Sequence, residues 1–179
     1  MQSSMTNGGE DLVSYRNPPV AEVALTVQFE PLPQPGLGFL ADIWSVLGQR
    51  FPISEAQPRL EPVVERTEPI TRLNFRLNID DPSAGPRWML YSEDKTQLLQ
   101  IQNNRFSRNW RKVAGADESE YPRYAGLVRN SFIQDYNELV SIYRKHKVGA
   151  PQINQCEIIY VNHVKFETGK TLTGHLGAL

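Results

Sequence analysis

Alternating hydrophobic and polar positions predict the first strand, between Pro19 and Pro31. The apolar or small residues of its buried side occupy odd positions, with mainly polar residues between them. A period of two is typical of a strand with one buried face. The odd positions are Ala21, Val23, Leu25, Val27 and Phe29.

A longer period predicts two helices. The first covers residues 37–51 and ends at Pro52, and its apolar positions recur three and four residues apart: Leu37, Leu40, Ile43, Trp44, Leu47 and Phe51. The second begins with Pro122 in its first turn and runs to about His146. Its apolar stripe consists of Val128, Phe132, Tyr136, Leu139, Val140 and Tyr143.

Short alternating segments predict an antiparallel meander between the helices. Residues 71–79 alternate cleanly, and residues 87–94 and 96–102 are short strands that form a hairpin across a polar turn. Residues 53–69 are rich in proline and acid, so we expect a loop or a short edge strand there. After the second helix, residues 155–167 form a last strand. Because this strand is apolar on both sides through residues 158–161, the pattern favours a central position in the sheet.

The predicted order is β-α-β-β-β-α-β, an α+β fold with a mainly antiparallel sheet and two helices on one face. We expect a flexible segment over residues 1–17, a single domain over residues 18–167, and a flexible tail over residues 168–179. The last strand resembles the start of a second unit, so the chain has the pattern of the first part of a duplicated β-α-β3 unit. Either the chain ends early, or an edge of the sheet is left for a partner.

Composition limits the classes of function. The 179 residues carry a net charge of −1, so any basic patch must be local. Cys156 is the only cysteine, which excludes an intrachain disulfide, and its strand context predicts a small core residue. No secretory signal and no membrane-length apolar run is present, so we expect a soluble, cytoplasmic protein.

Motifs for nucleotide, metal and covalent chemistry are missing. The sequence "TGKT" at residues 168–171 is preceded by Val164 where a phosphate-binding loop requires glycine. His146, His163 and His175 lie far apart without partners at ligand spacing, so we predict no metal and no cofactor. No catalytic residues stand out, and enzymatic activity would require a site assembled from distant segments.

The segment "NNRFSRNWRK", residues 103–112, is the strongest candidate for binding. Its cations are Arg105, Arg108, Arg111 and Lys112. The apolar phase is odd before Asn103 and even after Asn104, which predicts a bulge or a second hairpin there, with asparagine supplying a left-handed conformation.

The even phase places Phe106 and Trp110 inward, with Arg108 on their side and Arg105, Asn109 and Arg111 facing away. The conservative interpretation is that the arginine heads pair with acids of the next turn, which are Asp117, Glu118 and Glu120. The alternatives are contact with nucleic-acid phosphates and a protein interface. A base-stacking surface needs exposed aromatic rings, which the phase does not predict.

Several segments resemble a sporadically distributed bacterial family of uncharacterised proteins. They are "NPPVAEVALTVQFEP", "LLQIQNNRFSRNWRKV", "EYPRYAGL" and "YVNHV", over about residues 15–167. The most specific parts are Asn109-Trp110-Arg111 and Tyr121-Pro122-Arg123-Tyr124. The resemblance implies a longer typical length and defence-associated gene neighbourhoods, but no activity. We hypothesise a structural clasp, in which Trp110 packs under the second helix and Arg111 or Asn109 binds the turn at Tyr121.

Three functions follow as hypotheses. The first is a non-enzymatic module that binds another protein, including a second copy, through an open sheet edge or the polar face. The second is a nucleic-acid binder that uses Arg105, Arg108, Arg111 and Lys112. The third is a hydrolase with a dispersed site near Glu22 and Arg76.

Overall fold

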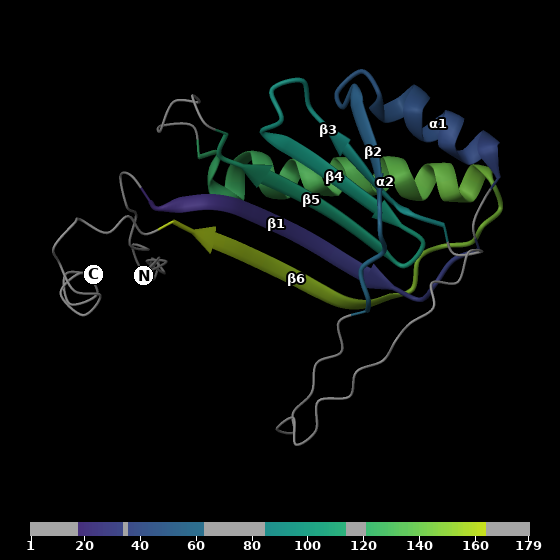
Figure 1. Cartoon of the computed structure of the whole chain (residues 1–179). Helices are drawn as coiled ribbons and strands as arrows, with labels where there is room; N and C mark the ends of the chain where they lie inside the picture. Colours follow the sequence, from purple (N-terminus) through teal and green to yellow (C-terminus); the bar gives the residue numbers. More distant parts are fainter. Residues whose placement is uncertain (1–17, 34–35, 63–84, 114–120, 164–179) are drawn as a thin grey trace, which may run out of the picture.

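A computed structural model describes residues 18–33, 36–62, 85–113 and 121–163 (Figure 1). These residues form one six-stranded sheet in which every neighbouring pair is antiparallel. The spatial order is β2-β3-β4-β5-β1-β6. The strands are β1 (Val20–Phe29), β2 (Ile53–Gln57), β3 (Arg87–Tyr91), β4 (Gln97–Gln102), β5 (Arg105–Arg111) and β6 (Ile153–Asn162).

The helices cover one face of this sheet, with α2 running behind it in Figure 1. They are α1 (Leu37–Leu47), the π-helix η2 (Arg123–Val128) and α2 (Arg129–Lys145). One core cluster combines both α-helices with the facing strands, and includes Phe39 and Tyr143, whose rings stack 5.1 Å apart. The predicted α+β class and order of elements are confirmed, and the second hairpin adds β5 to the middle run of strands.

The first helix is shorter than predicted, and its buried face overlaps the predicted stripe only in part. It ends at Leu47 and buries Phe39, Ile43 and Leu47, a set spaced by four residues. Leu37 and Trp44 are exposed, so the predicted stripe was wrong at these two positions. The stretch held more apolar residues than one helix face can bury, and the sheet selects the face.

A two-residue turn joins β4 to β5 and explains the change of apolar phase. Gln102 pairs with Arg105 across Asn103 and Asn104, so odd residues of β4 face even residues of β5, as in the pair Ile101 and Phe106. This is the second hairpin of the two predicted alternatives. Positive φ angles are absent from both asparagines, so the expected left-handed residue does not occur there.

Strand β1 is buried on both faces, not on one. Its odd residues enter the core, and its even residues lie against polar side chains of the neighbouring strands. The Thr26 hydroxyl donates to Ser107 at 2.8 Å, and both side chains are buried. Because β1 lies between β5 and β6, its polar side chains are enclosed by hydrogen-bonding neighbours.

Strand β6 lies at an edge of the sheet, which corrects the predicted central position. Cys156, expected in the core, is exposed on this strand. Hydrophobic periodicity reports which faces of a strand are apolar, and it does not specify how many strands lie beside it. The predicted strand at residues 71–79 and both predicted flexible ends, residues 1–17 and 168–179, lie outside the described residues.

Candidate functional site

The side chains of β5 separate onto two faces as the phase predicted. Phe106 and Trp110 are buried against the helices, and Arg108 lies on their side. Arg105 and Asn109 lie on the opposite face and are also buried. The exposed fractions of Arg105 and Arg108 are only 7% and 8%, so neither guanidinium forms part of an open basic strip.

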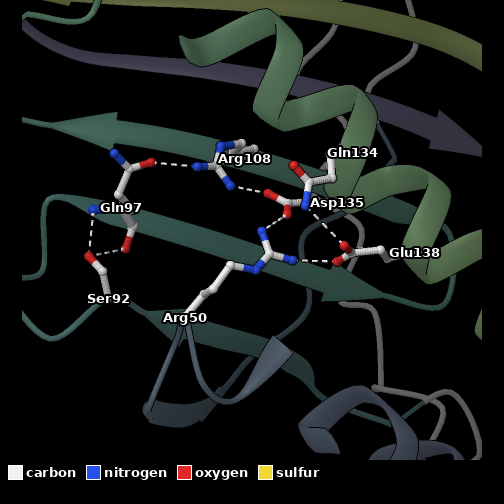
Figure 2. Close-up of polar contacts among 7 residues, drawn as sticks. All are labelled: Arg50, Ser92, Gln97, Arg108, Gln134, Asp135 and Glu138. Carbon is white, nitrogen blue, oxygen red and sulfur yellow. Dashed lines mark hydrogen bonds and ion pairs between the residues drawn. The ribbon is translucent and has the colours of Figure 1, made fainter. Parts of the chain in front are cut away.

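Arg108 belongs to a charge cluster between the sheet and α2. Its guanidinium donates to the carboxylate of Asp135 and to Oε1 of Gln97, the latter at 2.6 Å. Arg50 donates to the same Asp135 carboxylate and to Glu138. Figure 2 shows the Asp135 carboxylate between the two guanidinium groups.

The charges of this cluster hold the sheet and α2 together by balancing one another inside the fold. Burial raises the pKa of the Asp135 carboxyl, and the guanidinium groups of Arg108 and Arg50 oppose that rise. Burial likewise lowers the pKa of Arg108, against the attraction of Asp135. Because both carboxylate oxygens accept bonds from guanidinium groups, the buried charge is matched within the fold. The Arg108 head is therefore engaged by the protein itself.

The pairing of Arg108 with Asp135 was not predicted from the sequence. The acids expected to pair with the arginines, Asp117, Glu118 and Glu120, lie outside the described residues. A signal was present: Asp135 follows Phe132 by three residues and precedes Leu139 by four, which places an acid on the apolar stripe of α2. An arginine on the apolar phase of a strand is its natural partner.

The other three cations of the segment lie on the far face of the sheet or at its end. Arg105 donates to Gln28 at 3.0 Å and to the carbonyl of Glu61 at 3.2 Å. Arg111 donates from Nε to the carbonyl of Lys95 at 2.8 Å, and its guanidinium lies 5.2 Å from the ring centre of Tyr91. Lys112 is exposed. The structure therefore disperses the four cations instead of gathering them.

Trp110 forms the aromatic half of the hypothesised clasp. Its ring centre lies 5.3 Å from that of Tyr121, and Val128 and Tyr124 belong to the same cluster. Burial, together with a hydrogen bond to Tyr160, raises the pKa of Tyr121 to about 12. Pro122 precedes the first residue of the π-helix. The aromatic contact agrees with the hypothesis.

The polar side chains of the hypothesised clasp, Asn109 and Arg111, have other partners than the turn at Tyr121. Asn109 donates to Glu22 of β1 and accepts from Gln100 of β4, the latter at 3.0 Å. Arg111 binds Lys95, in the turn between β3 and β4. Both side chains lie on the face opposite Trp110, and so they are directed away from the turn at Tyr121.

An open apolar edge is the most prominent surface feature of the described residues. Five large hydrophobic side chains of β6 are each between 40% and 53% exposed: Ile153, Ile158, Ile159, Tyr160 and Val161. Four of them are consecutive, so both faces of the strand carry apolar groups. In Figure 1, β6 borders β1 on one side, and no other described strand flanks its outer side.

The opposite edge of the sheet has a different character. Strand β2 has five residues against ten in β6, and its sequence "ISEAQ" places exposed Glu55 at its centre. Short length and charge are the features with which proteins protect sheet edges from pairing. Strand β6 has one charged residue, Glu157, and no proline.

Two hollows lie elsewhere on the helical side. A groove of about 520 Å³ runs between α1 and α2 and is lined by charged residues that include Asp42, Glu138 and Lys145. A small cavity of about 20 Å³ lies beside Phe39 and Trp88. Neither is lined by Glu22 or by residues of β5. Arg76, the other residue of the suggested hydrolase site, lies outside the described residues.

Within the described ranges, no group of three or more histidine, cysteine or acidic side chains is placed to hold a metal ion. The helices in these ranges are also too short or too polar to span a membrane. Comparison with protein-family models, curated proteins and solved structures found no match. The family resemblance therefore stays a prediction.

Proposed function

We propose that this chain is a protein-interaction module that binds an extended segment of a protein partner along β6. The observation that carries the proposal is a conflict between sequence and position. Residues 158–161 have the continuous apolar pattern of a strand covered on both faces, whereas β6 is an exposed edge. A partner strand beside β6 would give these exposed side chains apolar cross-strand neighbours on both faces of the sheet.

The main chain of β6 is suited to strand addition. Phe29 donates its N–H to Asn104, and the carbonyl of Ala21 accepts from Lys112, so odd residues of β1 bond to β5. Even residues of β1 consequently bond to β6, and through the antiparallel register they meet the odd residues of β6. The N–H and C=O groups of the even residues, from Cys156 to Asn162, point outward to an incoming strand.

The side chains of β6 would provide specificity. Ile158 and Tyr160 share the face of the sheet on which the helices lie, and Ile159 and Val161 share the other. Cross-strand pairs of aromatic and β-branched residues each contribute about 0.2–1 kcal/mol. A partner with apolar residues on both faces of its strand would therefore be preferred over a polar one.

The nucleic-acid alternative has weaker support. It relies on a set of four cations, and two of these, Arg105 and Arg108, are buried in internal hydrogen bonds. Phe106 and Trp110 are buried as well, so they offer no ring for base stacking. Flat binding to generic nucleic acid across a salt titration would remove this alternative.

The proposal is tested by selecting decamer peptides from a random displayed library on the immobilised chain. We expect enriched peptides with apolar residues on both strand faces, and loss of their binding when Ile158 and Tyr160 are both replaced by lysine. The matched control replaces Leu37 and Trp44, exposed apolar residues of α1, by lysine and should retain binding. Peptides that bind the β6 variant as well as the parent would contradict the proposal.

A further inference from the structure

We infer that the strand received by β6 is β6 of a second copy of this chain, paired antiparallel about a two-fold axis at Ile159. This inference rests on the proposed function and specifies the partner. The two β6 strands would join two six-stranded sheets into one continuous sheet.

Strand geometry restricts how β6 can pair with itself. In an antiparallel ladder, hydrogen-bonded pairs form between residues whose main-chain groups point toward the partner strand. These are the even residues of β6, so the axis must pass through a residue position and not between two residues. An axis at Ile159 pairs Ile158 of each copy with Tyr160 of the other. The ladder from Cys156 to Asn162 then contributes about eight main-chain hydrogen bonds.

Side-chain matching favours Ile159 as the centre. With this axis, Ile159 opposes Ile159 and both flanking pairs join isoleucine to tyrosine, which are favourable cross-strand combinations. An axis at Ile158 leaves one apolar pair at the centre and sets Ile159 opposite Glu157. An axis at Tyr160 moves Ile158 opposite Asn162 and carries the ladder beyond the end of β6.

The single charge of β6 is compatible with this register. Glu157 lies opposite Val161 of the second copy, where its stem contacts an apolar side chain and its carboxylate stays at the surface. Two Glu157 carboxylates come together only if the axis passes through Glu157, where like charges would oppose pairing. No other charged residue lies on the strand, so self-pairing meets no other repulsion along β6.

The two-fold axis also explains exposed apolar groups beside the edge. It runs perpendicular to the sheet, so α2 of both copies lies on the same face. Ile133 is an exposed residue of α2 that neighbours Phe132 and precedes Tyr136 by one turn. Asp135, two residues after Ile133, faces Arg108 of β5 and Arg50 on the side of the sheet away from β6, and helical geometry places Ile133 on the opposite flank of α2. Ile133 therefore lies on the flank of α2 toward β6, where the second copy would help to cover it.

The first experiment measures mass by sedimentation over a wide concentration range. We expect a dimer for the parent chain and for Leu37→Lys, which changes an exposed residue of α1. Ile158→Lys should weaken the dimer at least about tenfold, because it places a cation against Tyr160 in a strand pair. A parent chain that stays monomeric throughout would overturn the inference.

The second experiment tests the register by cross-linking, with Cys156 replaced by serine. Ile159→Cys should form an intermolecular disulfide in high yield, because Cα atoms of a non-hydrogen-bonded pair lie about 4.5 Å apart. A mixture of Glu157→Cys and Val161→Cys chains should form the mixed disulfide, and each variant alone should form little. A dimer in which Ile159→Cys does not cross-link would overturn this register.

The peptide selection separates this inference from the proposed function. A monomeric chain that still selects peptides through β6 would reject the second copy as partner and leave the proposed function standing. A monomeric chain that selects none would reject both. A monomer whose outward β6 amides are protected from hydrogen exchange would show that the chain covers its own edge, and would also reject both.

Discussion

Arg108 of β5 donates a hydrogen bond to Asp135 of α2 across the interface between sheet and helix, and both side chains are buried. The pair links the middle of the sheet to the middle of α2, and Arg50 extends it to the segment after α1. It is the most deeply buried pair of charges among the ion pairs of the described residues. The loss of stability on substitution should therefore depend on whether one of the two charges is removed or both are removed together.

We predict strong coupling between these two residues. Asp135→Leu leaves Arg108 buried without its carboxylate and should lower the free energy of unfolding by about 3–5 kcal/mol. Arg108→Met should cost a similar amount, and the double variant should cost clearly less than the sum. Urea unfolding of the four proteins gives the coupling energy. Additive losses would contradict the pairing.

Glu138→Gln is the matched control for this cycle. Glu138 accepts from Arg50 at the margin of the same cluster, where its side chain is partly exposed. Solvent-exposed ion pairs contribute less than about 1 kcal/mol. The control variant should therefore unfold close to the parent, which separates the effect of burial from the effect of losing a carboxylate.

A second prediction concerns the end of α2. The N–H groups of Lys147 and Val148 donate to Arg144 and Tyr143, which closes the helix in a Schellman motif. Lys147 occupies the left-handed position, with φ of 54°. Because a side chain is strained there, Lys147→Gly should raise the free energy of unfolding by about 1 kcal/mol. Arg144→Gly, inside the helix, should lower it by about 1 kcal/mol. Thermal unfolding of both variants shows whether each is more or less stable than the parent.

The turn before β5 and the partner of Arg108 show what local sequence patterns can and cannot predict. The turn at Asn103 and Asn104 was predicted because a change of apolar phase is a local signal, and the inward direction of Trp110 followed from it. The partner of Arg108 is 27 residues away in sequence, on an element whose rotation about its axis is set only by packing. Asp135 on an apolar stripe was a local anomaly whose partner the sequence did not specify.

The position of β6 illustrates the same limit at the level of the sheet. Its apolar pattern is a local property, and the pattern is present in the structure as exposed isoleucine and tyrosine side chains. The number of strands beside it depends on pairing with β1, a segment more than 120 residues earlier in the chain. Residue patterns therefore predicted the class of the fold and the inward face of β5, whereas the buried faces of α1 and β1 and the order of the strands required the assembled fold.

A third prediction follows from Tyr121 at alkaline pH. Burial and the contact with Tyr160 raise its pKa to about 12, above the ordinary value of 10.0. Between these values the unfolded chain loses the phenolic proton and the folded chain keeps it, so stability falls as pH rises above 10. Tyr121→Phe should make the decline between pH 10 and 12 shallower. Urea midpoints measured across this range test it, with Tyr124→Phe as the control that keeps Tyr121.

The last prediction concerns Asp42, which joins α1 to the end of α2. Its carboxylate accepts from Lys145 at 2.8 Å and from Nε2 of His146 at 2.6 Å. Lys145 and then His146 lower the pKa of this carboxyl below its ordinary value of 3.8. A lowered pKa in the folded state contributes stability above the ordinary value, and that contribution is lost as pH falls through the folded one.

Replacing Asp42 by asparagine should therefore lower the unfolding midpoint at pH 7, and the difference from the parent should shrink as pH falls below about 4. High salt should also shrink the difference, because the pair is accessible to ions. Glu93→Gln removes a carboxylate in the turn after β3 and serves as the control for net charge. A deficit of Asp42→Asn that does not shrink at all as pH falls below 3.8 would assign the effect to packing between the helices, because the part that comes from the charged carboxylate declines in that range.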